Sequence, residues 1–245
     1  FNLFQSGHRR YDQDVLGTWD DNRQTESSFR EDCWRYVESD YGKMPVKPTL
    51  DGEPSYEWIL QGLHDKNEPY WQAADVRRYA YWDVFAGAAG HTYGHNAVMQ
   101  FQRREEEQGT FGVNVPWDEG IHHSGGAQMK HLKDLMESVD FLHGKPASHY
   151  LLSQQGEKYE RISVYAGPDY LMAYSYTNRT IKLSLKDYKD KPMEVYWFCP
   201  ATGVKSYIRT VTGQDEIMET PSSSDETTDI VLLLQEEKPA FLENI

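Results

Sequence analysis

Three short polar runs in the first half of the chain each follow an apolar stretch. They are Gln5-Ser6-Gly7-His8, Asp51-Gly52-Glu53-Pro54 and His91-Thr92-Tyr93-Gly94-His95-Asn96. They recur roughly every 45 residues, the spacing of strand–helix units with elaborated loops, and functional side chains of such barrels lie at the carboxyl ends of the strands. The spacing therefore predicts that polar side chains from distant segments meet at one end of a parallel sheet.

Glu53 carries the most specific chemistry of the three runs. Its carboxylate is fixed between Gly52 and Pro54, so a strand end would hold it stiffly. A retaining glycosidase needs such a carboxylate as nucleophile and a second one about 5–5.5 Å away as acid/base. The alternative is that Glu53 only hydrogen-bonds to a neighbouring strand or loop.

Several histidines and a tyrosine accompany Glu53 in these runs. His8, His91, Tyr93 and His95 are suited to binding sugar hydroxyls or to holding Glu53 ionised. A metal cluster is the alternative, but the spacing matches no standard ligand pattern with an acidic partner. We therefore expect no metal and no cofactor. His122-His123, in a glycine-flanked loop, is expected to be solvated.

Aromatic residues are abundant, at 13% of the chain with 7 Trp and 17 Tyr. Rings of this kind stack on sugar faces, although buried core positions are the commoner explanation. Trp58, Trp71 and Trp117 fall in expected loops, where a sugar platform and core packing are both open. Trp82 falls within an expected helix and is predicted to be core.

The composition excludes several classes of partner. The 245 residues carry 25 basic and 39 acidic side chains, a net charge of −14, which disfavours nucleic acid and anionic membranes. No apolar run approaches the ~18–20 residues that span a bilayer. Cys33 and Cys199 are far apart in sequence and are expected to be buried thiols, not a disulfide or a metal site.

Periodicity divides the chain into two parts, 1–145 and 146–245. In the first part we expect strands at 1–4, 45–50 and 90–101 (strand and loop), and helices at 25–41, with Thr25 as N-cap, 73–89 and 125–139. In the second part we expect short strands at 163–166, 170–176, 181–185, 194–198, 206–211 and 230–234, with a solvated loop at 219–229. Alternating strands and helices indicate a parallel sheet, and the later strands indicate a small antiparallel sandwich.

Longer motifs resemble a known family. They are Phe4-Gln5-Ser6-Gly7-His8, Pro45-Val46-Lys47-Pro48 through Asp51-Gly52-Glu53-Pro54-Ser55-Tyr56-Glu57, Ala74-Asp75-Val76-Arg77-Arg78, Tyr81-Trp82, Phe85-Ala86-Gly87-Ala88-Ala89-Gly90-His91-Thr92-Tyr93-Gly94, and Gly125-Gly126-Ala127-Gln128-Met129. Together they resemble the apiosidase-like glycoside hydrolases, family 140 and its relatives. The segment from Tyr196-Trp197-Phe198 to Gly203 is similar to the sandwich domain often named "putative collagen-binding".

The resemblance implies an α/β fold, the C-terminal part of a (β/α)8 TIM barrel (strands 6–8) followed by an all-β antiparallel sandwich. It also implies a retaining mechanism with Glu53 as nucleophile at the end of strand seven. His8, Tyr56, His91 and Tyr93 match polar positions that would line the same pocket, with Trp58 as a further sugar contact.

The family's acid/base carboxylate belongs to an earlier strand, which would precede Phe1. Three strands cannot close a barrel, so we expect this chain to be a fragment whose partner is the N-terminal half of the same barrel. The expected function is a periplasmic or secreted bacterial enzyme, exo-acting on side chains of plant cell-wall or related polysaccharides. The alternative is a non-catalytic carbohydrate-binding or structural protein.

Overall fold

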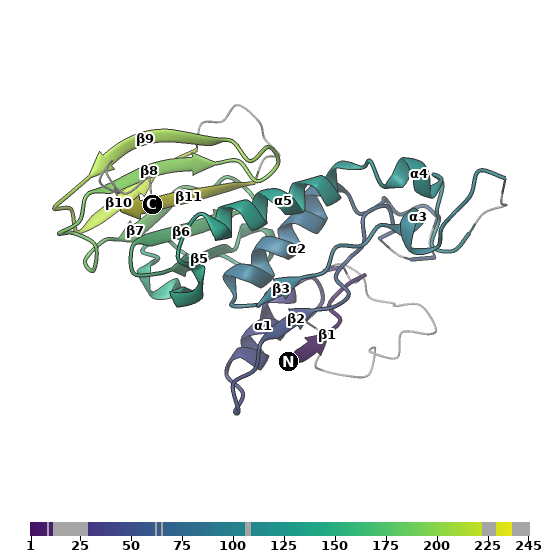
Figure 1. The fold of residues 1–245 in the computed structure, drawn as a ribbon, viewed down its shortest axis with the longest axis horizontal. Coiled ribbons are helices and arrows are strands. Elements are labelled where there is room, and N and C mark those ends of the chain that lie inside the picture. The colour runs from purple at the N-terminus through teal and green to yellow at the C-terminus, as the bar shows by residue number, and fades with distance from the viewer. Residues whose placement is uncertain are drawn as a thin grey trace, which may run out of the picture. The chain divides into compact units, whose positions relative to one another are not determined.

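The computed structural model describes residues 1–8, 10–11, 29–61, 63–64, 66–105, 109–221 and 229–236. The chain forms two compact units, Phe1–Lys130 and His131–Ile245, which are described separately below (Figure 1). Within the described ranges, no helix combines the length and apolarity needed to cross a bilayer.

A three-stranded parallel sheet forms the base of the first unit. Its strands are β1 (Asn2–Phe4), β2 (Thr49–Asp51) and β3 (Gly90–His91), in the order β1-β2-β3. Phe4 pairs with Asp51, and Asp51 pairs with His91, so the three carboxyl ends are level. Parallel neighbours need crossover connections, and α1 (Cys33–Tyr41) and α2 (Ala73–Phe85) lie in the two crossovers (Figure 1). The predicted parallel strand–helix alternation is thus confirmed.

The two crossover helices are shorter than predicted. Helix α1 begins after Asp32, because residues 29–32 form turns, and the predicted N-cap Thr25 lies outside the described residues. Helix α2 ends at Phe85, close to Gly87, whose φ of 104° is incompatible with a continuing right-handed helix. Its first turn is closed by a capping box between Gln72 and Asp75, which satisfies two otherwise free backbone N–H groups.

The two faces of this sheet differ in exposure. Thr49 and Asp51 are fully or almost fully buried, whereas Leu3, which pairs with Leu50 on the neighbouring strand, is 60% exposed. Side chains alternate between the faces of a strand, so the face that carries Leu3 is the open one. Phe1, before the first strand, is 78% exposed.

Two short helices and one long helix follow the sheet. They are α3 (Asn96–Met99), α4 (Trp117–Gly120) and α5 (Ser124–Glu137). The interval 90–101, predicted as strand and loop, contains α3 because the side chain of His95 accepts a hydrogen bond from the Ala97 N–H and caps a helical turn. The predicted helix 125–139 corresponds to α5.

The second unit is built on antiparallel strands. A six-stranded sheet has the order β4-β5-β6-β11-β8-β9, and β10 pairs with β7. The strands are β4 (Lys145–Pro146), β5 (Ile162–Ala166), β6 (Tyr170–Ser175), β7 (Ile181–Ser184), β8 (Met193–Phe198), β9 (Lys205–Val211), β10 (Glu216–Glu219) and β11 (Ile230–Glu236). Single 3-10 turns lie at Phe141–His143, Ser148–Tyr150 and Lys158–Glu160.

All six strands predicted in this part are present, with ends shifted by one or two residues. The prediction missed β4 and β10, and β10 reaches into the interval expected to be loop. Most of that interval, 222–228, lies outside the described residues. The apolar core of this unit includes Ile162, Leu171, Leu183 and Leu232, all with no exposed surface. The central strands β5 and β6 are buried along their whole length, and β-branched and other aliphatic side chains fill the space around them.

Both cysteines are free thiols, as predicted, and they belong to different units. Cys33 is fully buried at the start of α1. Cys199 is only half-buried, so the expectation that both thiols are buried is wrong for Cys199.

Candidate active site

The ends of β1 and β2 are joined by backbone hydrogen bonds. The Gly7 N–H donates to the Glu53 carbonyl at 2.9 Å, and the Gly52 N–H donates to the Phe4 carbonyl at 2.9 Å. A Cβ on Gly7 would lie 2.3 Å from the Pro54 carbonyl carbon, so only glycine permits this approach. The first two polar runs of the sequence therefore meet, as their spacing predicts.

Glu53 and His8 face each other across this junction. The His8 Nε2 atom lies 3.5 Å from the Glu53 Oε1 atom, and the Glu53 side chain is 43% exposed whereas that of His8 is 8% exposed. His8 adopts a φ of 68°, an uncommon conformation for a non-glycine residue, and its N–H donates to the Ser55 hydroxyl at 2.9 Å. The surroundings therefore hold His8 against Glu53, while the buried His8 Nδ1 has no hydrogen-bond partner within the part of the chain that the structure describes.

Tyr56 extends this cluster. Its ring meets the His8 ring edge-on, with centroids 5.3 Å apart. Burial raises the pKa of the Tyr56 hydroxyl, and the carboxylates of Glu53 and Asp51 raise it further. Tyr56 is therefore a neutral hydroxyl beside Glu53, able to donate a hydrogen bond to a ligand oxygen.

A pocket of about 440 Å³ opens beside Tyr56. Its lining comes from the segments that follow β2 and β3 and from α3, α4 and α5: Tyr56, Tyr93, Gly94, His95, Val98, Met99, Gly120, Ile121, Gly126 and Ala127. Two rings predicted to bind substrate, Tyr56 and Tyr93, thus share one pocket. Two aromatic walls with hydroxyl groups suit a ligand that has apolar faces and polar edges, as sugars do.

A buried carboxylate orients the second of these rings. The Tyr93 hydroxyl donates to the Glu57 carboxylate at 2.6 Å, and the Gly125 N–H donates to the same side chain at 3.3 Å. Burial and this bond raise the pKa of Tyr93 above its ordinary value. Glu57 is 2% exposed, so it links the Tyr93 ring to the first turn of α5 and does not face the pocket.

His95 and His123 form a pair at the pocket wall. The His95 Nδ1 atom accepts from the Ala97 N–H, so its Nε2–H donates to the His123 Nδ1 atom at 2.9 Å. Burial, and then the neighbouring His123, lower the pKa of His95 to about 4, so the imidazole is neutral near pH 7. His123 is half-buried and partnered, which corrects the expectation that it is solvated.

Trp58 packs against His123 and is not among the residues that line the pocket. Its ring lies 4.9 Å from that of His123 and 5.4 Å from that of Tyr70, centroid to centroid. Its φ is 62°, with the N–H bonded to the Trp71 carbonyl and the carbonyl accepting from the Asn96 side chain. A direct sugar contact by Trp58 stays a prediction.

Burial differs among Trp71, Trp82 and Trp117. Trp71 is 1% exposed and Trp82 is fully buried, so both belong to the core. Trp117 is 36% exposed and packs against Phe101 at a centroid distance of 5.8 Å.

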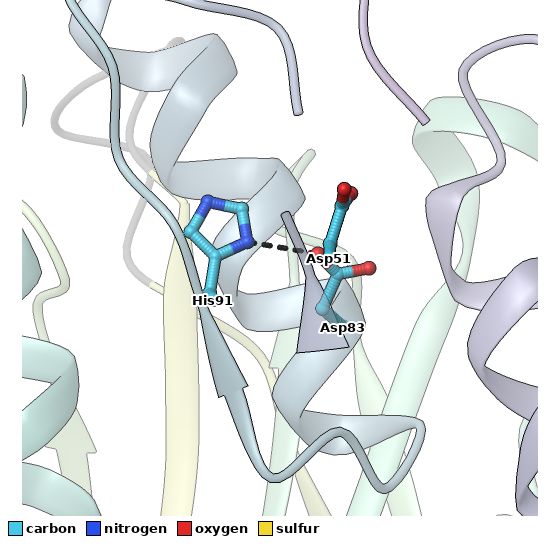
Figure 2. Close-up of side chains that lie close together, drawn as sticks. All are labelled: Asp51, Asp83 and His91. Atoms are coloured by element: carbon cyan, nitrogen blue, oxygen red, sulfur yellow. Dashed lines mark hydrogen bonds and ion pairs between the residues drawn. The ribbon is translucent and has the colours of Figure 1, made fainter. Parts of the chain in front are cut away.

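His91 is separated from the other predicted substrate contacts. Its side chain is 5% exposed, and its Nδ1 atom lies 2.8 Å from the Asp83 Oδ2 atom (Figure 2). Burial lowers the pKa of His91 to about 4. The imidazole therefore points into the interior beside α2, because β3 ends at His91 and Tyr93 follows in coil on the pocket side. His91 therefore does not line the pocket with Tyr56 and Tyr93, contrary to what the resemblance implied.

Asp51 completes a buried acidic cluster with Asp83 and His91. One side-chain atom of each lies within 4.8 Å of the others, a spacing that a cation could occupy. However, the Asp51 oxygens already accept from the Glu53 N–H at 3.1 Å, the Ser6 N–H at 3.4 Å and the Ser6 hydroxyl. These hydrogen bonds satisfy both oxygens of the buried Asp51 carboxylate, so its burial does not require a metal.

Burial dominates the ionisation of both carboxyl groups. It raises the pKa of Asp51 to about 7, with a further increase from Asp83 and a partial offset by the Ser6 hydroxyl. Burial also raises the pKa of Asp83 to about 8, partly offset by the neighbouring polar side chains of Cys33 and Asp51. Near neutral pH the cluster therefore holds protons that exposed carboxylates would release.

Four residues of this region were given no role by the sequence interpretation: Asp51, Glu57, Asp83 and His123. Asp51 opens the polar run that contains Glu53, but no role was predicted for it. Asp83 carried a readable signal, since a carboxylate sits between Trp82 and Val84 in an aromatic stretch of a helix. A charge at such a position is rarely fully buried without a partner.

Solved structures similar to this chain are glycoside hydrolases. One, described as a glycoside hydrolase, is 39% identical over 99% of this chain and 54% of its own, with a TM-score of 0.89. Another, a glycoside hydrolase family 5 protein from Bacteroides vulgatus ATCC 8482, is 37% identical over 99% of this chain and 52% of its own, also with a TM-score of 0.89. The chain thus spans about half the length of these two proteins. No curated protein matches.

The family can be stated more narrowly. Residues 1–143 match the family described as "Apiosidase-like, catalytic domain", and residues 146–235 match "Putative collagen-binding domain of a collagenase". The chain belongs to the apiosidase-like family, as the motif resemblance predicts.

Proposed function

We propose that this chain carries the nucleophile half of a retaining glycoside hydrolase, with Glu53 as the nucleophile. The observation that supports this most is the position of Glu53 at the carboxyl end of β2, facing His8 at 3.5 Å from the adjacent parallel strand. The 43% exposure of its side chain leaves the carboxylate accessible to a substrate. Membership of the apiosidase-like family makes a glycoside the expected substrate class.

The proposed reaction has two steps, formation of a glycosyl–enzyme ester and its hydrolysis. A Glu53 oxygen attacks the anomeric carbon while the glycosidic C–O bond breaks, and the leaving oxygen takes a proton from an acid on the other barrel half. Water, deprotonated by that same residue, then attacks the glycosyl–enzyme ester and releases Glu53 as a carboxylate. His8 and Tyr56 lie where they can steady Glu53 and donate to a substrate hydroxyl.

The acid/base carboxylate belongs, in this proposal, to an upstream half of the same barrel. The open sheet face with Leu3 60% exposed supports this, since a core strand is ordinarily covered on both faces in a parallel sheet. The relatives' chains are about twice as long as the matched region. We further propose a bacterial, periplasmic or secreted enzyme that removes terminal sugars from side chains of plant cell-wall or related polysaccharides. Apiose is one candidate sugar.

Replacing Glu53 by glutamine tests the nucleophile directly. In the chain joined to its upstream half, E53Q should lower kcat at least ~10⁴-fold on a screened panel of aryl glycosides, since it removes the attacking carboxylate. The exposed Glu105 supplies the matched control, because E105Q changes the same functional group away from the site. Wild-type rates in E53Q would reject the assignment.

The same experiment separates the second candidate, a non-catalytic carbohydrate-binding protein. The aromatic pocket walls, Tyr56 and Tyr93, would favour binding whether or not turnover follows. Saturable sugar binding without product release by the complete protein would support that role and exclude the hydrolase.

A further inference from the structure

Asp51 bonds directly to the backbone that carries Glu53. Its Oδ1 atom accepts from the Glu53 N–H at 3.1 Å and from the Ser6 N–H at 3.4 Å, while the Ser6 hydroxyl donates to Oδ2. One carboxylate therefore connects the end of β1 to the turn after β2. The first segment carries His8, which faces Glu53, and the second segment contains Glu53 itself.

Buried polar groups surround this connection, in a layer where apolar side chains would cost less free energy. Asp51 and Asp83 have no exposed surface, and the His91 side chain is 5% exposed. Among the described residues, the buried Asp83 Oδ1 and His91 Nε2 atoms have no hydrogen-bond partner. Unsatisfied buried atoms are uncommon in folded proteins and call for an explanation in function or bound ligands.

We propose that Asp51 is a positioning residue that fixes the backbone of the candidate nucleophile Glu53. The hydrogen-bonded Asp83–His91 pair lies next to Asp51 in the buried interior and keeps its side chain in place (Figure 2). This rests on the proposed function of Glu53. Asp51 does not touch the substrate, because it is fully buried on the side of the sheet opposite Leu3. It acts by holding the turn so that the Glu53 carboxylate faces His8.

Catalysis is sensitive to such placement. A displacement of about 1 Å can lower a rate about 100-fold. In the complete enzyme, D51A should therefore lower kcat about 100-fold and leave KM within about 2-fold, because binding groups stay in place. D51N retains one acceptor oxygen and should lose only about 10-fold. The exposed Asp118 gives the control D118N, expected to match wild type.

A double substitution separates positioning from general damage to the fold. In E53A, azide can replace the missing carboxylate as an external nucleophile and form a glycosyl azide. Since Asp51 acts through Glu53, D51N should change the azide-rescued rate of E53A less than about 2-fold. An equal loss in both backgrounds would show that Asp51 maintains the fold in general and would overturn the proposal.

Two further outcomes are decisive. If E53Q is inactive while D51N and D51A keep wild-type kcat, the positioning role is wrong and the proposed function stands. If E53Q is active, the proposed function itself fails. Metal analysis of dialysed enzyme should find no stoichiometric ion, and one equivalent of metal that is lost in D83N or H91Q would replace the hydrogen-bonded network with a metal site.

Discussion

The two units differ in the share of charged side chains that their interiors bury. In the first unit, polar and charged side chains lie fully or almost fully buried around α2, among them Asp51, Asp83, Arg78 and Glu31. In the second unit, the cluster around Leu232 is almost wholly aliphatic. Apolar burial stabilises a fold without specifying direction, whereas buried polar groups stabilise only the arrangement in which they are paired. The polar interior lies next to Glu53, where orientation matters for chemistry.

The largest effect expected from this comparison comes from a buried ion pair. Arg78 on α2 and Glu31, before α1, lie 2.6 Å apart with both side chains 1% exposed. E31A should lower the free energy of unfolding by about 3–5 kcal/mol, because it removes the shorter of two ion pairs of the buried Arg78 and leaves the contact with Asp75 at 3.4 Å. Chemical denaturation of the complete enzyme measures it, with E105A as a surface control. A loss below about 1 kcal/mol would mean that water reaches Arg78.

A cavity in the apolar core should cost slightly less and behave differently. Leu232, at the centre of β11, has no exposed surface, so L232A should lower stability by about 2–5 kcal/mol. The effect should not depend on pH, and kcat should be unchanged. Hydrogen exchange followed by mass spectrometry should show faster opening confined to the second unit. V204A, at a side chain 57% exposed, is the control and should stay within about 0.5 kcal/mol.

The buried carboxyl groups should make the first unit sensitive to pH. Their folded pKa values, about 7 for Asp51 and about 8 for Asp83, exceed the ordinary value of 3.8. The folded state thus binds protons that the unfolded state releases, so the contribution of these groups to stability is full below about pH 3.8 and is lost as pH rises from there through the folded values. His91, with its pKa lowered to about 4, opposes this trend only below pH ~6.5.

Between pH 6.5 and 8 we therefore expect a loss of about 2 kcal/mol, the smallest of the three effects. Unfolding curves at several pH values, with the second unit as internal reference, measure it. D83N removes one titrating group and the charge that raises the pKa of Asp51, so its curve should be flatter. An identical slope in D83N would assign the pH dependence to other groups.

Much of the fold followed from the sequence. Alternating apolar segments predicted the parallel order of β1, β2 and β3, and all six strands expected in the second unit are present. Shorter elements such as β4, β10 and α3 were missed, because two to four residues show no period. Pairing with another strand, or a cap such as that from His95, determines them, and both depend on tertiary contacts.

The sequence predicted the polar residues at the strand ends, but it did not predict the buried cluster around Asp83 and His91. The polar runs that contain His8 and Glu53 were predicted to meet, and these two side chains do face each other in the structure. The orientation of the His91 side chain could not be predicted. Side chains alternate between the two faces only within a strand, and the sequence does not show that β3 ends at His91. Asp83 lies on α2, 32 positions from Asp51 along the chain, so only packing brings them together.

The central claim is that Glu53 forms a covalent bond to the sugar. Intact-mass and peptide analysis of the complete enzyme, after incubation with an activated 2-deoxy-2-fluoro glycoside of a sugar it releases, measures this directly. The account predicts a mass increase of one fluorosugar on the peptide that contains Glu53, absent in E53Q. A label on another carboxylate, or turnover without any covalent adduct and with inverted product, would contradict it.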